Sequence, residues 1–158
     1  MNEDRAFLRH TLATLAYRGG KATRGADDGF ASFRASPSSR TPIMVLCHIG
    51  DLLDWALSIA VGKQTWHNST PLTWDEESAR FFAALQAFDS FLASDQPLAA
   101  PAEKLFQGPI ADALTHVGQI NMLRRIAGGP IKGENYYVAA IESGRVSADQ
   151  PAPRAEFD

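Results

Sequence analysis

The stretch TPIMVLCHIGDLLDWALSIAV, residues 41–61, decides the fold. It opens with Thr41, a good N-cap, and Pro42, which fits the first position of a helix. Apolar residues then recur at helical spacing up to Gly62, which predicts a helix over most of this stretch. The longest apolar run of the chain lies here, but polar residues interrupt it at His48, Asp51 and Asp54. We therefore interpret it as a buried helix and not as a membrane span.

Further segments on both sides of this helix also carry helical signals. Each shows apolar residues at helical spacing, a capping signal or both: residues 3–18, 73–93, 102–127 and 135–143. Gly19-Gly20 should end the first of these helices. The sequence TWDE at 73–76 has the spacing of a capping box. Gly108-Pro109 should kink the fourth helix of the chain, residues 102–127, because proline removes a backbone donor.

The segments between these helices read as loops. Residues 19–40 are rich in glycine, serine and small residues, and we expect a long loop pinned by Phe30 and Phe33. No strand signal stands out. Residues 147–158 contain two prolines and little to bury, which predicts a tail. The expected organisation is therefore one helical domain over residues 1–146 and a C-terminal tail over residues 147–158.

Composition restricts the classes of partner. The chain has 158 residues, about one domain, with 15 Lys+Arg against 18 Asp+Glu and a formal charge of −3. It has no basic run with interleaved aromatic residues, so we expect no nucleic-acid partner. A single cysteine excludes an intrachain disulfide, and no signal-peptide pattern is seen at the N-terminus. We expect a soluble, cytoplasmic protein without a membrane partner.

One stripe of the predicted helix 102–127 carries groups that bind metals. Asp112, His116 and Gln119 are spaced three or four residues apart, so they share one margin of its apolar face. In the helix 41–61, His48 is directed inward and can approach them from across a bundle. An inward aspartate is costly to bury as an ion. A bound cation would offset that cost, and so would a buried hydrogen bond or an ion pair with one of the arginines at 124 and 125.

Other polar residues have simpler interpretations. Cys47 adjoins His48 but points to the other face of the helix, as an ordinary small residue. His10 and His67 are interpreted as solvated or packing groups. The segment containing Glu134 and Tyr136 is either a turn or part of a pocket wall.

Together these residues resemble a known family. An inward His48 and a later His116, followed by glycine and glutamine, are similar to the DinB-like superfamily of small four-helix-bundle metalloenzymes, over roughly residues 5–146. The resemblance extends to three segments and points to a bacterial subgroup: HVGQI at 116–120, LRRIAG at 123–128 and GENY at 133–136. Family members usually bind a divalent metal through three histidines, one in the second helix and two in a His-x-x-x-His pair. Asp112 takes the first position of that pair here, and we expect it to be the third ligand.

The resemblance implies a fold and a metal. The expected fold is an all-α four-helix bundle of the up-down-down-up type with a short additional C-terminal helix. The expected ligands are His48, Asp112 and His116, with Gln119, Trp55, Glu134 and Tyr136 around them or in the adjoining pocket. Two imidazoles and one carboxylate suit Fe(II), but Ni, Zn or Mn also bind such sites. A carboxylate in place of an imidazole should make metal-bound water less acidic.

The resemblance also implies a class of function. We expect a divalent-metal protein, either a metal-dependent hydrolase or a transferase that uses a low-molecular-weight thiol as cosubstrate. The substrate is expected to be a small molecule, and the protein a homodimer. The alternative is a non-catalytic binding or assembly domain that a metal stabilises. An open crevice at the metal would favour the enzyme, because a structural site is closed by protein ligands.

Overall fold

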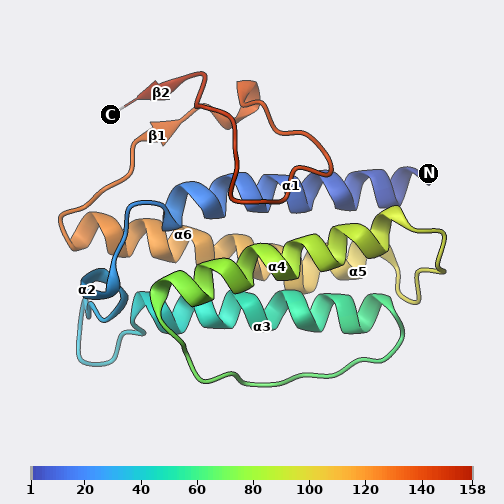
Figure 1. Ribbon diagram of the computed structural model, residues 1–158, viewed down its shortest axis with the longest axis horizontal. Helices are drawn as coiled ribbons and strands as arrows, with labels where there is room; N and C mark the ends of the chain where they lie inside the picture. Colours follow the sequence, from blue (N-terminus) through green and yellow to red (C-terminus); the bar gives the residue numbers. More distant parts are fainter. Residues whose placement is uncertain (1, 158) are drawn as a thin grey trace.

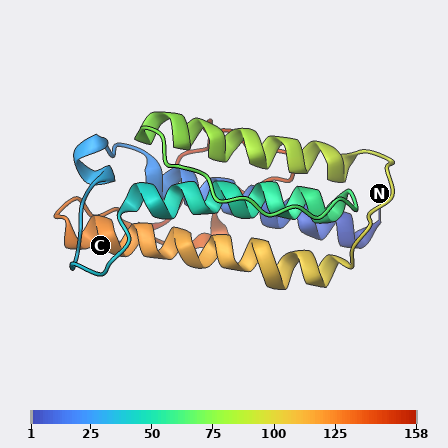
Figure 2. The same cartoon turned by 90° about the horizontal axis from the view of Figure 1, so that it is seen from below.

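A computed structural model, which describes residues 2–157, is mostly helical and confirms the all-α prediction. Its long helical segments are α1 (Glu3–Thr23), α3 (Pro42–Ala60), α4 (Trp74–Ala93) and a final segment that joins α5 (Ala102–Leu105), η1 (Phe106–Ile110) and α6 (Ala111–Ile126). These segments lie side by side along one axis (Figures 1 and 2). Helix α3 packs against α4 and α6, and α1 packs against the same two helices.

The connection between α3 and α4 determines how the helices run. Residues 61–73 return along the length of the molecule, so that α3 and α4 point in the same direction (Figure 1). The segment from α5 to α6 runs back the other way beside α3 (Figure 2). Helix α6 therefore presents its residues to α3 along a shared seam.

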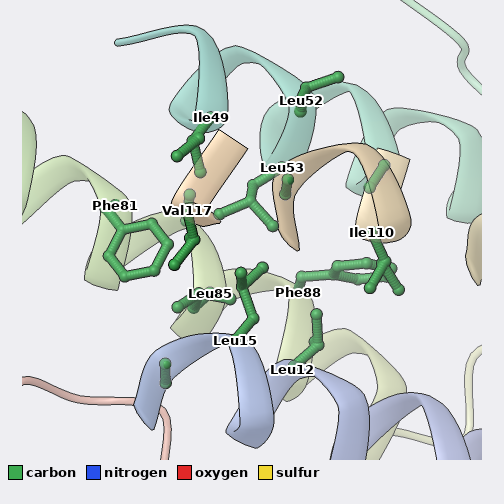
Figure 3. Close-up of a cluster of buried hydrophobic side chains, with 14 of the residues drawn as sticks. Leu12, Leu15, Ile49, Leu52, Leu53, Phe81, Leu85, Phe88, Ile110 and Val117 are labelled. Carbon is green, nitrogen blue, oxygen red and sulfur yellow. The ribbon is translucent and has the colours of Figure 1, made fainter. Parts of the chain in front are cut away.

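Apolar side chains from every long segment fill the space between the helices. Figure 3 shows side chains of α1, α3, α4, η1 and α6 converging on a common centre: Leu12, Leu15, Ile49, Leu53, Phe81, Leu85, Phe88, Ile110 and Val117. All of them are buried. Burial of this apolar surface is the main source of stability in such a bundle.

The helix starts follow the sequence signals. The predicted capping box is present: Thr73 accepts from the backbone N–H of Glu76, and Glu76 accepts from that of Thr73. Thr41 is the N-cap of α3, but its side chain forms no capping hydrogen bond, and Pro42 occupies the first turn.

By length and composition α3 could cross a membrane, yet more than half of its apolar window is buried within the fold. Helix α3 is therefore placed like the core helix of a soluble protein.

The prediction that Gly19-Gly20 ends the first helix is wrong, because α1 continues to Thr23. Both glycines are buried where α1 packs against α4. A Cβ atom at position 19 would lie 2.5 Å from Cζ of Phe81. Gly19 is thus required for the close approach of a phenylalanine ring and not for a turn.

We expect Gly19→Ala to destabilise the fold. Phe81 is 1% exposed, so its ring would have to shift within the packed core to clear an added methyl group. Overpacking of this kind costs about 1–3 kcal/mol, which exceeds the gain of up to about 1 kcal/mol from replacing a helical glycine. Urea unfolding followed by circular dichroism measures the change. The control is Gly118→Ala in α6, where an added Cβ meets nothing within 4 Å and should stabilise. Equal stability changes in the two variants would contradict this account.

The predicted kink at Gly108-Pro109 takes the form of a π-helical turn, Phe106–Ile110, with Pro109 inside it. Proline lacks the N–H that would continue the α-helical ladder, and the turn widens to accommodate it. The long segment therefore continues into α6 without a break.

The loop predicted at 19–40 begins later, because α1 extends to Thr23, and it contains one short helix, α2 (Asp28–Ala31). As predicted, Phe30 and Phe33 pin the loop, and both pack against the core. The Phe30 ring meets that of Trp74 edge-on, with the centroids 5.4 Å apart.

The C-terminal region differs from its predictions. Residues 135–143 form only a single 3₁₀ turn, η2 (Tyr136–Val138), none of whose residues is buried, so no packing stabilises a longer helix there. Two short antiparallel strands, β1 (Gly133–Glu134) and β2 (Glu156–Phe157), were not predicted. Two-residue strands carry no periodic pattern in a sequence. The end of the predicted tail thus returns to the domain and pairs with it (Figure 1).

Candidate metal centre

Three metal-ligand side chains from two helices meet at one point. His48 comes from α3, and Asp112 and His116 come from successive turns of α6. One ligand atom of each residue lies within 4.8 Å of the other two. The structure thus brings together the three residues that the sequence predicted as ligands.

The separations between these atoms suit a first-row metal. Nε2 of His116 lies 3.4 Å from Oδ1 of Asp112, and Nε2 of His48 lies 3.9 Å from Oδ2. Two atoms that each bind the same tetrahedral Zn²⁺ at about 2.1 Å are about 3.4 Å apart. The two imidazole rings meet at 89°, with centroids 4.7 Å apart. An ion between the three groups would need only small side-chain adjustments.

Gln119 holds His116 in the form that a ligand requires. Nδ1 of His116 and Oε1 of Gln119 are 2.7 Å apart. An amide oxygen only accepts, so Nδ1 donates, and the lone pair of the ring is then on Nε2, the atom that faces Asp112. Metal-bound histidines are commonly oriented by such a hydrogen bond from the other ring nitrogen.

Aromatic rings surround the other imidazole. The His48 ring meets Trp66 edge-on at 5.7 Å, and Trp66 meets Trp55 in the same way at the same centroid distance. Trp55 is therefore one ring removed from the ligand, and the loop residue Trp66 makes the direct contact.

Burial lowers the pKa of His48, and the nearby His116 and Arg40 lower it further, in that order. His48 is consequently neutral, with its lone pair free for a ligand, near neutral pH.

Asp112 is not inward, contrary to expectation. Its side chain is 49% exposed, whereas that of His116 is 11% exposed. An ion pair with an arginine at 124 or 125 is not formed either: Arg124 donates to the backbone carbonyls of Ala22, Arg24 and Gly129. Asp112 therefore carries no burial penalty that a cation must offset, and its position beside the two imidazoles is what points to a metal.

A pocket of about 500 Å³ opens beside His116. Its wall combines apolar and polar side chains from the loop before α3, from α3 and from α6: Ser39, Arg40, Val45, His116, Gln119, Met122 and Leu123. A second, smaller hollow of about 210 Å³ lies at His48 and shares Arg40 with the first. The volume of the larger pocket is typical of small-molecule sites.

A second cluster of potential ligands was missed by sequence reasoning. Asp51, Asp54 and His67 also have ligand atoms within 4.8 Å of one another. However, Nη2 of Arg80 lies 2.6 Å from Asp51 and 2.9 Å from Asp54. The guanidinium already supplies the cation between these carboxylates. Asp51 and Asp54 lie three residues apart and so share a helix face, but no local pattern indicates that Arg80 is their partner.

This ion-pair cluster fixes the loop 61–73. Ser69 donates to Asp51 through its backbone N–H at 2.9 Å and its hydroxyl at 2.6 Å, and His67 bridges Asp51 and Asp54. Burial opposes ionisation of Asp51, but the hydrogen bonds from Ser69 and Arg80 outweigh it and lower the pKa of the carboxyl group. His67, expected to be solvated or packed, therefore anchors the loop that carries Trp66.

The remaining predicted residues lie elsewhere. Glu134 accepts a hydrogen bond from Tyr17 at 2.6 Å and pairs with Lys21 at 2.8 Å, and Tyr136 packs on Tyr17. Glu134 and Tyr136 line a separate pocket beside β1, not the one at His116. Cys47 is buried, and burial raises the pKa of its thiol to about 11, which keeps it protonated.

Comparisons of the chain with protein-family models, curated proteins and solved structures found no match. The resemblance to the DinB-like superfamily therefore stays a prediction from the sequence.

Proposed function

We propose that the protein binds a divalent metal through His48, Asp112 and His116 and uses it on a small-molecule substrate, as a hydrolase or a thiol-dependent transferase. One observation carries the proposal: a pocket large enough for a substrate ends on His116, and Asp112 is half exposed. A structural metal site is closed by protein ligands, whereas a catalytic one keeps open positions. Of the three ligands, His116 borders the larger pocket, His48 borders the smaller one and Asp112 is half exposed, which matches the second case.

The donor set supports a first-row metal. Two neutral imidazoles and one carboxylate suit Fe(II), Zn, Ni or Mn. A divalent ion bound there would act as a Lewis acid and lower the pKa of a coordinated water or thiol. The carboxylate leaves a formal charge of about +1 on the site, so this acidification is weaker than with three imidazoles.

Residues of the chain supply the rest of the chemistry. Gln119 keeps the proton of His116 on Nδ1, away from the metal-facing atom. Val45, Met122 and Leu123 offer an apolar wall for the body of a substrate. Arg40 lies at the junction of the pockets at His116 and His48, where its charge would attract an anionic group.

The same proposal includes the properties that the resemblance implies. These are membership of the DinB-like superfamily, an up-down-down-up bundle topology, a cytoplasmic location and a homodimer. Elution volume on size-exclusion chromatography with light scattering tests the last of these directly.

Cobalt substitution tests the open site. We expect the protein to bind one Co(II), and we expect azide to change the visible spectrum of the bound ion, because a vacant position accepts an exogenous ligand. A protein that binds Co(II) but whose spectrum ignores azide would instead be a metal-stabilised domain without catalysis. Absence of specific Co(II), Zn(II) and Fe(II) binding would overturn the metal proposal. The variant His10→Ala, far from the cluster along α1, serves as the matched histidine control.

A further inference from the structure

The pocket beside β1 that Glu134 and Tyr136 line is a hollow of about 340 Å³ between α1, α6 and the C-terminal strands. Helix α6 forms its floor with one stripe of residues: Gly118, Asn121, Met122 and Arg125. The opposite side comes from Arg18 of α1 and from the segment that leads into β1, with the Phe157 ring of β2 at the edge. The metal-centre pocket uses the neighbouring stripe of α6, and Met122 borders both.

The charge around this hollow is positive although the protein is acidic. Arg18, Arg125 and Lys132 line it, and within residues 2–157 none of them lies within 4.0 Å of a carboxylate oxygen. Lys132 is nevertheless near enough to Glu156 to help lower the pKa of that carboxyl group. Glu134 also lines it, but the side chain is fully buried and both of its oxygens are engaged, by Tyr17 and Lys21. The guanidinium of Arg18 stacks on the Tyr136 ring at 4.3 Å. Three cations therefore face a space in which the only lining carboxylate is already neutralised.

Asn121, which also lines the hollow, has a hydrogen-bond acceptor without a donor. Its Oδ1 is shielded from solvent and has no hydrogen-bond partner within residues 2–157. A shielded acceptor without a donor is destabilising, and natural proteins keep few of them. Because this oxygen is shielded, a ligand with an O–H or N–H group would satisfy it once the side-chain amide of Asn121 turns toward the hollow.

Gly118 keeps the floor of the hollow open. It lies in the middle of α6, where glycine is unfavourable relative to alanine. Packing does not require it, because an added Cβ would meet nothing within 4 Å. Two destabilising features, Gly118 and Asn121, thus lie one helical turn apart and border the same cationic hollow. Residues that lower the stability of the fold are common at functional sites.

We infer that this hollow binds a small organic acid that carries a hydrogen-bond donor and an apolar body. The carboxylate would pair with Arg125 and Lys132, and the body would lie over Gly118 against the Phe157 ring. The ligand's donor would reach Oδ1 of Asn121 after the side-chain amide turns toward the hollow. The site is separate from the candidate metal centre and does not depend on the function proposed for it.

Three related compounds test the chemistry of the ligand: 4-hydroxybenzoate, 4-methoxybenzoate and 4-hydroxybenzamide. Each is titrated into the ¹⁵N-labelled protein without added metal, with the backbone amide of Gly118 and the side-chain amide of Asn121 as NMR reporters. We expect 4-hydroxybenzoate to bind saturably, and the methoxy and amide analogues to bind about tenfold more weakly, because each lacks one of the matched interactions. Equal affinity for the three compounds, or shifts that map to His116 instead, would refute the inference.

Variants test the residues. Gly118→Leu should fill the hollow and Asn121→Leu should remove the acceptor, and each should weaken 4-hydroxybenzoate binding at least about tenfold. Neither should lower the midpoint of thermal unfolding, because one replaces a helical glycine and the other an unsatisfied amide. A merely structural role for these residues would lower that midpoint and leave binding unchanged.

Further variants test the role of the positive charge and whether the hollow is independent of the metal centre. Lys132→Gln should weaken binding severalfold, whereas Lys104→Gln, at an exposed lysine of α5 outside the hollow, should not. His116→Ala should leave the affinity for 4-hydroxybenzoate unchanged. Loss of binding in His116→Ala, or equal effects of the two lysine changes, would overturn the inference without bearing on the metal proposal.

Discussion

Replacing His116 with alanine is expected to abolish specific metal binding. His116 is the most buried of the three candidate ligands, and its Nε2 faces Asp112 at 3.4 Å. Loss of a group that only orients a metal ligand costs about 10–100-fold in affinity, so loss of the ligand itself should cost more than about a hundredfold. Competition with a chromophoric zinc chelator measures the constant.

His67→Ala is the informative control for this experiment. His67 belongs to the other cluster of potential ligands, where Arg80 already bridges the two carboxylates. Its replacement should leave zinc affinity unchanged while loosening the loop 61–73. If His67→Ala released the metal and His116→Ala retained it, the metal site would have to be assigned to the cluster of Asp51, Asp54 and His67 instead.

The second large effect concerns the core. Phe88 is completely buried in the centre of the bundle, beside Leu12 and Ile110 (Figure 3). Its replacement by alanine should cost about 3–5 kcal/mol, through lost burial and the cavity left behind. That is a large part of the 5–15 kcal/mol that typically stabilises a domain. The denaturant midpoint, followed by far-ultraviolet circular dichroism, should fall accordingly.

An exposed phenylalanine provides the comparison. Phe7 is 56% exposed, and Phe7→Ala should cost about 1 kcal/mol or less. Similar midpoints for Phe7→Ala and Phe88→Ala would mean that the core described for this bundle does not hold it together.

The sequence predicts the helices well where local signals are strong. The capping box at Thr73 and the Thr41-Pro42 start both mark helix N-termini within one residue of those observed. It fails at Gly19 because the same residue type serves as a helix stop and as a point of close contact. The two roles can be distinguished only from the position of Phe81, which lies about sixty residues further along the chain.

The candidate site was predictable in part for a similar reason. Asp112, His116 and Gln119 are local neighbours on one helix, so their spacing alone relates them. The approach of His48 rests on how α3 packs against α6. The interactions of His67 and Glu134 join residues far apart in the chain, with Asp51 and Lys21 respectively, and no local pattern encodes them.

The parallel course of α3 and α4 affects how the protein folds and opens. Two parallel helices cannot form a hairpin, so the chain must first close the long connection 61–73, at an entropic cost that rises only slowly with its length. Both ends of the connection are held by backbone hydrogen bonds, but its middle part, residues 64–71, is held through the amides of Thr65 and Ser69, which donate to Ser58 and Asp51. Such a segment can detach while the bundle stays intact, because local opening costs less than global unfolding. Each detachment would lift Trp66 from the His48 ring, so fluctuations of this connection would set how often solvent reaches that imidazole.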